Sequence, residues 1–343
     1  MKVAVYYSNK DVRIEDRPVP GISDHELLVE MKASGICGTD VMEWYRIKKA
    51  PCVLGHEMAG EIAESGSLVK GFKKGDRVFV SHHVPCYKCH YCINGNYTAC
   101  ESLHAGNFEP GGFSEFIRVP EDNVRSGTFL LPDAIKYEEA AMIEPLACAI
   151  AGQNRLGIKK GQTVLVIGSG VSGILHIQLA KKKGANVVAT DIDTYRIKKA
   201  TEFGAEYVIH AEKYSVDTLK NINDDRLADA VITCAAAEQA VENAISSVGR
   251  KGKILFFAVP ENDITIPSQK FWRDEISLFF SYGAGPDSIK TAIHYIEKGF
   301  INVGELITHT VPLSEIMRGF RLVSDAGNSL KVVIIPDRYH LKK

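Results

Sequence analysis

Four cysteines in a short stretch have the spacing of a metal site. Cys86, Cys89, Cys92 and Cys100 follow the pattern C-x-x-C-x-x-C-x7-C. Short C-x-x-C spacing lets successive thiolates converge on one ion, and four soft thiolates form a closed tetrahedral zinc site. The alternatives are an iron–sulfur cluster, which also takes four thiolates, and four incidental cysteines. A closed site leaves no position for a substrate, so we expect it to stabilise a loop with little core of its own.

A second set of potential ligands is spread along the chain. Cys37 is followed by the adjacent pair His56 and Glu57, and Glu144 comes much later. One thiolate, one imidazole and one or two carboxylates can hold zinc with a coordination position open, which is the pattern of a catalytic site. From spacing alone this signal is weak, because a lone histidine or cysteine in an apolar context more often belongs to the core.

A glycine-rich turn follows an apolar, β-branched run that is typical of a buried parallel strand, Thr163–Ile167. The turn reads G-x-G-x-x-G, with Gly168, Gly170 and Gly173 leading into an amphipathic helix. Gly168 permits the tight turn, Gly170 lets the backbone approach a pyrophosphate at the helix N-terminus, and Gly173 allows close helix–strand packing. Asp191 ends the next strand, where its carboxylate can accept hydrogen bonds from the adenosine ribose and would repel a 2′-phosphate. We therefore predict NAD rather than NADP.

The order of predicted elements indicates an α/β protein with two domains. Residues 1–150 contain short strands separated by turn signals, which favours a partly closed barrel or sandwich. From residue 163 onward strands alternate with helices, which is the signature of a doubly wound sheet. We predict a cofactor domain at 151–285, inserted into a β-rich catalytic domain made of 1–150 and 286–343.

Composition excludes several classes of partner. The formal net charge of −1 leaves no electrostatic footprint for nucleic acid or an anionic membrane. No apolar run approaches the roughly 20 residues that span a bilayer, and Met1–Tyr7 resembles a strand more than a signal peptide. We expect a cytoplasmic protein in a reducing compartment, whose eight cysteines are thiols or metal ligands rather than disulfides.

Several segments together resemble the zinc-containing medium-chain alcohol and polyol dehydrogenases, close to the sorbitol and threonine dehydrogenase branch. In chain order they are Gly35–Asp40, Gly55–Glu57, the four-cysteine segment, Pro110–Phe116, Ile143–Leu146 and Gly168–Gly173. The resemblance covers nearly the whole chain. It implies a GroES-like catalytic domain, a Rossmann cofactor domain, and NAD with one catalytic and one structural zinc ion per chain.

The resemblance also implies roles for single residues. Cys37 and His56 would ligate the catalytic zinc, and Glu57 and Glu144 would complete the ligand set, directly or through water. Asp40 would lie behind His56 and fix its imidazole. Glu144 stands where simple alcohol dehydrogenases often carry a cysteine, which favours the polyol branch.

Two routes for the substrate proton remain open at this point. The resemblance places Thr39 where a hydroxyl binds the substrate oxygen and can start a proton relay. Glu57 could instead handle the proton through a zinc-bound water.

Further contacts are implied around the cofactor and the substrate. The candidate cofactor contacts at the glycine turn and beyond the strand ends are Val171, Ser172, Ile192, Arg196, Cys234, Ala258, Val259, Ser281 and Tyr282. Lys331 could approach the cofactor phosphates. Arg46 lies in a basic run that could contact an acidic substrate but is more often a solvated surface. His82 and His83 have no clear role.

We predict an enzyme that interconverts a secondary alcohol of a polyol, inositol or sugar-like compound and its ketone, as a homodimer or homotetramer. The alternatives among enzymes are oxidation of threonine or another amino alcohol, and a zinc-free quinone reductase-like activity. From other classes, the chain could be a catalytically inactive NAD-binding protein or a zinc-ribbon interaction protein. The near-zero net charge opposes a zinc ribbon that binds nucleic acid.

Overall fold

The chain folds into two compact units. The computed structural model describes residues 1–260 and 262–340. The inserted unit is Cys148–Gly283, and the discontinuous unit combines Met1–Ala147 with the described residues from Ala284 onward. No helix in these described parts is both long enough and apolar enough to cross a membrane.

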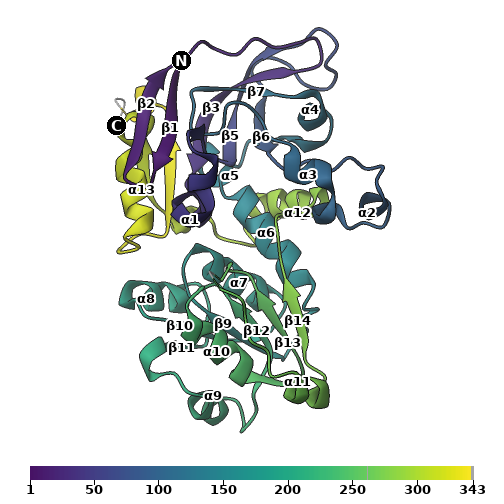
Figure 1. Cartoon of the computed structure of the whole chain (residues 1–343), viewed down its shortest axis with the longest axis vertical. Coiled ribbons are helices and arrows are strands. Elements are labelled where there is room, and N and C mark those ends of the chain that lie inside the picture. Colours follow the sequence, from purple (N-terminus) through teal and green to yellow (C-terminus); the bar gives the residue numbers. More distant parts are fainter. Residues whose placement is uncertain (261, 341–343) are drawn as a thin grey trace. The chain divides into compact units, whose positions relative to one another are not determined.

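The inserted unit is built on a six-stranded parallel sheet (Figure 1). Its strands are β9 Thr163–Ile167, β10 Asn186–Asp191, β11 Tyr207–His210, β12 Ala228–Thr233, β13 Val248–Phe256 and β14 Ser277–Phe280. Their order in the sheet is β11-β10-β9-β12-β13-β14. The strand order therefore reverses between β9 and β12, and in open α/β sheets ligands bind beyond the carboxyl ends of the strands at such a point.

Helices cover both faces of this sheet. They are α7 Val171–Lys182, α8 Thr194–Glu202, α9 Val216–Ile222, α10 Glu238–Ser247 and α11 Ser268–Asp274. Val164 and Val166 of β9 belong to one hydrophobic cluster with residues of α7 and α8. Leu165 and Ile167 belong to the other cluster, with residues of α9, α10 and α11. Burial on both sides explains why β9 reads as a continuous apolar run, and the predicted doubly wound fold class is confirmed.

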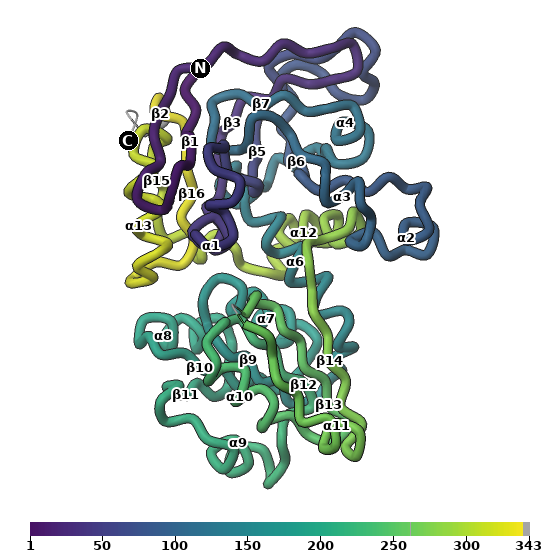
Figure 2. Tube along the Cα trace, in the orientation of Figure 1, coloured from purple at the N-terminus to yellow at the C-terminus, as the bar shows by residue number. Residues whose placement is uncertain are grey.

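The discontinuous unit contains a seven-stranded and a three-stranded sheet. The larger sheet comprises β3 Leu27–Gly35, β5 Glu57–Ser65, β6 Arg77–Ser81, β7 Phe116–Val119, β8 Thr128–Leu130, β15 Ile307–Pro312 and β16 Lys331–Ile335, and the smaller comprises β1 Lys2–Ser8, β2 Asp11–Asp16 and β4 Cys52–Val53. Strand β3 pairs with β5, β7 and β16, so it is the centre of the larger sheet. Figure 2 shows the last strands of the chain close to the first ones, and both ends contribute to one hydrophobic cluster.

The helices of this unit are mostly short. They are α1 Glu43–Arg46, α2 His90–Ile93, α3 Glu101–Ala105, α4 Glu121–Gly127, α5 Tyr137–Ala140, α12 Pro286–Glu297, α13 Ile316–Ser324 and α14 Asp337–His340, and α6 Ile143–Asn154 contains the boundary to the inserted unit. Most of the apolar residues of the 132–150 segment lie in two separate helices, α5 and α6. Pro145 lies in the first turn of α6, where no intrahelical N–H donor is required, so the proline marks a helix start.

The turn between β9 and α7 depends on two glycines in different ways. Gly168 has a φ of +90°, which is a left-handed backbone conformation. A Cβ added at Gly173 would lie 1.9 Å from the carbonyl oxygen of Gly168, which is backbone and cannot rotate away. A Cβ at Gly170 would meet nothing nearer than 3.8 Å, from Arg196.

This difference predicts that two similar substitutions lower the stability by unequal amounts. Gly173→Ala should lower the free energy of unfolding by about 3 kcal/mol or more, at the upper end of overpacking costs. The melting temperature should then fall by about 6–12 °C. Gly170→Ala, the matched control, should cost at most about 1 kcal/mol. Thermal unfolding followed by circular dichroism measures both, and equal melting temperatures would contradict the packing argument.

Candidate functional site

Three potential ligands from distant segments meet at one end of β3 and β5. One ligand atom each of Cys37, His56 and Glu57 lies within 4.8 Å of the other two. Cys37 comes two residues after β3, and Glu57 is the first residue of β5. Since β3 and β5 are antiparallel with Gly35 opposite Glu57, the register of the sheet brings these side chains together.

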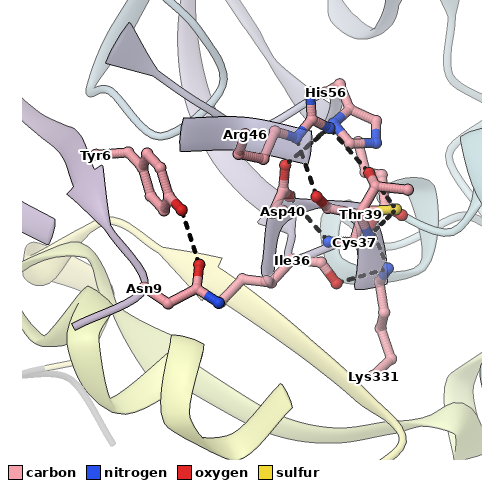
Figure 3. Close-up of polar contacts among 10 residues, drawn as sticks. Tyr6, Asn9, Ile36, Cys37, Thr39, Asp40, Arg46, His56 and Lys331 are labelled. Atoms are coloured by element: carbon pink, nitrogen blue, oxygen red, sulfur yellow. Dashed lines mark hydrogen bonds and ion pairs between the residues drawn. The ribbon is translucent and has the colours of Figure 1, made fainter. Parts of the chain in front are cut away.

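Asp40 holds the imidazole of His56 from behind. Its side chain is completely buried, and Oδ1 lies 3.5 Å from His56 Nδ1 (Figure 3). Oδ2 accepts a hydrogen bond of 3.0 Å from the backbone N–H of Cys37, which caps the 3₁₀ turn Gly38–Val41. Burial acts to lower the pKa of His56, but the charges of Asp40 and Cys37 outweigh it and raise that pKa well above its usual 6.5. Burial acts to raise the pKa of Asp40, yet His56 and Arg46 lower it overall.

Arg46 and Thr39 form a second layer beside the three ligands. The hydroxyl of Thr39 donates a hydrogen bond of 3.2 Å to Cys37 Sγ. Arg46 donates from Nη2 to Thr39 Oγ1 at 2.9 Å and from Nε to the Thr39 carbonyl at 3.0 Å. The Arg46 side chain is only 13% exposed, whereas Lys48 and Lys49 of the same basic run lie on the surface. The solvated-surface interpretation therefore does not hold for Arg46.

Glu57 is paired with a buried lysine. The ammonium of Lys331 forms an ion pair with the Glu57 carboxylate and donates to the carbonyl of Ile36 at 3.1 Å. Burial acts to lower the pKa of Lys331, but Glu57, Cys37 and Glu144 raise it overall, so the lysine stays charged. The structure thus places Lys331 inside the discontinuous unit as the counterion of Glu57. Glu144 acts on Lys331 through its charge, but it is not among the three residues whose ligand atoms converge.

His82, to which the sequence pattern assigns no clear role, lies against the ligand cluster. Its ring centroid lies 4.9 Å from that of His56 and 3.6 Å from that of His83, whose ring is tilted by 35° to it. Burial, together with the neighbouring His83, His56 and Arg46, lowers the pKa of His82 well below 6.5, so its ring is neutral. The only signal for this contact in the sequence was that the two histidines directly follow the segment that forms β6. In the structure β6 pairs with β5, and Ser81 lies opposite Glu57.

The four cysteines predicted to form one cluster do converge. Cys86, Cys89, Cys92 and Cys100 each offer a sulfur within 4.8 Å of the others. The backbone N–H of Cys86 donates to Cys100 Sγ at 3.4 Å, and that of Cys89 donates to Cys86 Sγ at 3.3 Å. Burial acts to raise the pKa of Cys100, but N–H groups of Cys86 and Leu103 lower it overall. Leu103 and two of the cysteines are the buried members of the local hydrophobic cluster, so the segment is suited to a structural zinc ion.

Asp191 is fixed at the end of β10, next to the glycine turn. Its Oδ2 accepts a hydrogen bond of 2.6 Å from the backbone N–H of Ser169, and its Oδ1 accepts one of 2.9 Å from that of Asp193. Arg196 lies near the start of α8, and its guanidinium approaches Gly170. A fixed carboxylate and a bare glycine backbone therefore lie at the same edge of the sheet.

The remaining candidate cofactor contacts follow the carboxyl ends of the parallel strands or begin α7. They are Val171 and Ser172 in α7, Ile192 after β10, Cys234 after β12, Ala258 and Val259 after β13, and Ser281 and Tyr282 after β14. Cys234 and Ala258 are anchored by backbone hydrogen bonds to Ile167 and Thr233. Ile192, Val259 and Tyr282 are exposed. All lie at the edge of the sheet where open α/β folds bind ligands.

Comparison with known proteins identifies the family. Residues 23–132 match the alcohol dehydrogenase GroES-like domain, and residues 172–298 match the zinc-binding dehydrogenase family. The chain is 33% identical to sorbitol dehydrogenase of Bacillus subtilis (strain 168), and the alignment covers 98% of each protein. The chain belongs to the zinc-binding medium-chain dehydrogenase family. The family resemblance seen in the sequence is confirmed. The prediction of an oxidoreductase of the alcohol and polyol class is confirmed as well.

Two solved structures show how members of this family differ. Galactitol-1-phosphate dehydrogenase from Escherichia coli is 27% identical, with a TM-score of 0.86, over 98% of this chain and all of the other. A dehydrogenase from Sinorhizobium meliloti 1021 that is bound to NADP is also 27% identical, with a TM-score of 0.86, over 98% of this chain and 99% of the other. One of these relatives is named for a phosphorylated alcohol and the other is bound to NADP. The preference of this chain for a substrate and for a nucleotide must therefore be argued from its own residues.

Removing one thiol of the four-cysteine cluster should lower the stability of the protein, whereas removing a thiol outside it should not. Cys86→Ser should lower the melting temperature by several degrees and the zinc content by about one ion per chain, because three thiolates hold the metal less tightly. Cys52→Ser is the matched control, since Cys52 is half-buried in β4 and outside both clusters. Thermal unfolding and metal analysis are the measurements. A Cys86→Ser protein with unchanged zinc and stability would rule out this stabilising role.

Proposed function

We propose that the protein is an NAD-dependent and zinc-dependent dehydrogenase that interconverts a secondary alcohol of a polyol, inositol or sugar-like compound and its ketone. The observation that carries this proposal is the convergence of Cys37, His56 and Glu57, with Asp40 behind the imidazole. A zinc-free reductase of the same fold would have no use for these groups.

The donor set fits a catalytic zinc ion. In the proposal Cys37 and His56 are ligands, and Glu57 and Glu144 complete the set directly or through water. A thiolate, an imidazole and a carboxylate leave a position open for substrate, and Asp40 fixes the imidazole as carboxylates commonly do behind zinc-bound histidines. When bound, zinc would supply the Lewis acidity that lowers the pKa of an alcohol, and NAD would be the hydride acceptor.

The residues of the chain have separate tasks in this reaction. Oxidation of the carbinol would break its C–H and O–H bonds and form a C=O bond. Bound NAD would take the hydride, and the proton would leave to water. Thr39 would hydrogen-bond the reacting oxygen. Lys331 would keep the Glu57 carboxylate oriented and its charge compensated inside the protein, because it is the ion-pair partner of that group.

The preference for NAD is supported by the position of Asp191. Both of its oxygens accept backbone hydrogen bonds, so the carboxylate cannot swing away from a nucleotide that reaches the end of β10. It is also 6% exposed, so little solvent screens its charge. A ribose hydroxyl could donate to this group, whereas a 2′-phosphate would meet like charge.

The substitution Asp191→Gly should therefore relax the preference against NADP. We expect the ratio of kcat/KM for NADP to that for NAD to rise at least about tenfold, the equivalent of removing about 1.4 kcal/mol of repulsion. The measurement is steady-state kinetics with both nucleotides. Glu202→Gly, at the exposed end of α8, is the control and should leave the ratio unchanged. An unchanged ratio in Asp191→Gly would mean that its carboxylate does not meet the ribose.

The function itself is tested by NADH formation across polyols, inositols, sugar phosphates, threonine and simple secondary alcohols. We expect turnover with at least one polyol or sugar-like alcohol. Cys37→Ser should lower kcat/KM by more than about 100-fold, because it removes a metal ligand. NAD binding should survive, since Cys37 is not part of the inserted unit. Cys52→Ser should stay active.

Each alternative has its own outcome in the same assay. Turnover of threonine alone would favour an amino-alcohol dehydrogenase. An unimpaired Cys37→Ser enzyme would remove the catalytic zinc from the proposal. Intact NAD binding without turnover of any alcohol would favour a catalytically inactive nucleotide-binding protein.

A further inference from the structure

Arg46 contacts Thr39 at two points from a largely buried position. Its Nε donates to the Thr39 carbonyl at 3.0 Å, and its Nη2 donates to Thr39 Oγ1 at 2.9 Å (Figure 3). The guanidinium also lies 4.9 Å from the centroid of the Tyr45 ring, and Nη2 is 3.4 Å from Asp40 Oδ1. These contacts hold the guanidinium in one orientation at the end of the short helix α1.

Hydrogen-bond geometry then determines where the Thr39 proton points. A guanidinium can only donate hydrogen bonds, so Thr39 Oγ1 must be the acceptor in its contact with Arg46. A hydroxyl carries one proton, and Oγ1 directs it to Cys37 Sγ, at 3.2 Å. The Thr39 proton is therefore directed toward the ligand cluster and away from Arg46.

We propose that Arg46 is a positioning residue that keeps the Thr39 proton pointing into the ligand cluster. There the hydroxyl donates to Cys37 Sγ when no substrate is present and to the reacting oxygen when substrate is bound. This inference rests on the dehydrogenase function proposed for the site. In alcohol oxidation negative charge develops on that oxygen as its proton is lost, and a donor already oriented toward it lowers the barrier without reorganisation.

The same arrangement closes one route for the substrate proton. A relay through Thr39 would require an acceptor on its far side, and Arg46 occupies that side with N–H donors and no lone pair. The proton of the alcohol therefore does not pass from Thr39 to Arg46. Of the two routes that the sequence left open, the geometry disfavours a relay in this direction.

A purely structural role for Arg46 makes a different prediction. Arg46 also approaches Asp40, so its loss could disturb His56 through that carboxylate. Asp40 has two other partners, the backbone N–H of Cys37 and the ring of His56. An effect through Asp40 would persist after the Thr39 hydroxyl is removed, whereas an effect through Thr39 would disappear.

A double-mutant cycle separates the two roles in the zinc-loaded enzyme. Arg46→Met and Thr39→Val should each lower kcat/KM about 10- to 100-fold, for the alcohol of the panel with the highest wild-type kcat/KM. The double variant should lose no more than about threefold beyond the more impaired single variant. The effect should appear mainly in kcat, and the pH at which kcat rises should move upward in both single variants.

Arg13→Met is the matched control, since Arg13 also lies over a tyrosine ring, Tyr7, and pairs with an aspartate, Asp11. Its side chain is 62% exposed and lies outside the ligand cluster. Its kcat/KM and pH profile should match those of the wild type.

A spectroscopic measurement tests the same inference without turnover. With cobalt replacing zinc and no substrate present, the thiolate-to-cobalt absorption reports on the hydrogen bond that Thr39 donates to Cys37 Sγ. Bands from the four-cysteine cluster are common to all variants and cancel in difference spectra. Arg46→Met and Thr39→Val should shift the remaining band in the same direction, and Arg13→Met should leave it in place.

Each outcome supports or overturns the inference. If Arg46→Met causes the same loss whether or not Thr39→Val is also present, the inference is overturned in favour of a role in bracing Asp40. A loss confined to alcohols that carry a carboxylate or phosphate would overturn it in favour of direct substrate contact. Cobalt spectra unchanged by Arg46→Met would also overturn it. A wild-type enzyme that oxidises no alcohol would refute the proposed function as well, whereas additive variants of an active enzyme would refute only this inference.

Discussion

Buried charge is the constraint on which the candidate site depends. The side chains of Asp40 and Glu57 are 0% and 1% exposed. Carboxylates removed from water are stable only when they are paired or hydrogen-bonded. Asp40 has His56 and Arg46 as partners, and Glu57 has Lys331. These cations compensate the buried carboxylates and orient them, so they matter to the fold as well as to the chemistry.

The antiparallel sheet decides which of these groups meet. In register, Gly35 lies opposite Glu57, and Glu57 lies opposite Ser81, which precedes the adjacent histidines His82 and His83. Strand β16 joins β3 with Val333 opposite Gly35, and this brings Lys331 to the same place. A Cβ at Gly35 would lie 2.1 Å from the Glu57 carboxylate and 2.7 Å from the Lys331 side chain. Glycine at this position therefore leaves room for the buried ion pair.

In the inserted unit, backbone N–H groups hold the buried carboxylate at the end of β10. Asp191 is held by the N–H groups of Ser169 and Asp193. The glycine turn leaves further backbone at the N-terminus of α7, where partial positive charge favours an anion. The turn lies next to the point between β9 and β12 where the strand order reverses. Both the carboxylate at the end of β10 and the glycine turn beside it thus follow from one parallel topology.

The sequence by itself determined the features that depend on local pattern. The apolar run of β9, the glycine turn and the four-cysteine spacing could be read directly, because periodicity and short spacing constrain neighbours along the chain. The alternation of strands and helices likewise predicted the doubly wound sheet. The break between α5 and α6 has no clear signal in the sequence, because the apolar pattern continues across it.

Only the tertiary structure decided how the second cluster is assembled. The packing of His82 against His56, the pairing of Lys331 with Glu57 and the contact of Arg46 with Thr39 join side chains through strand register or through loop conformation. The sequence position of a lysine or arginine does not show which buried carboxylate it will neutralise. That choice depends on burial and distance, which exist only once the sheet has formed.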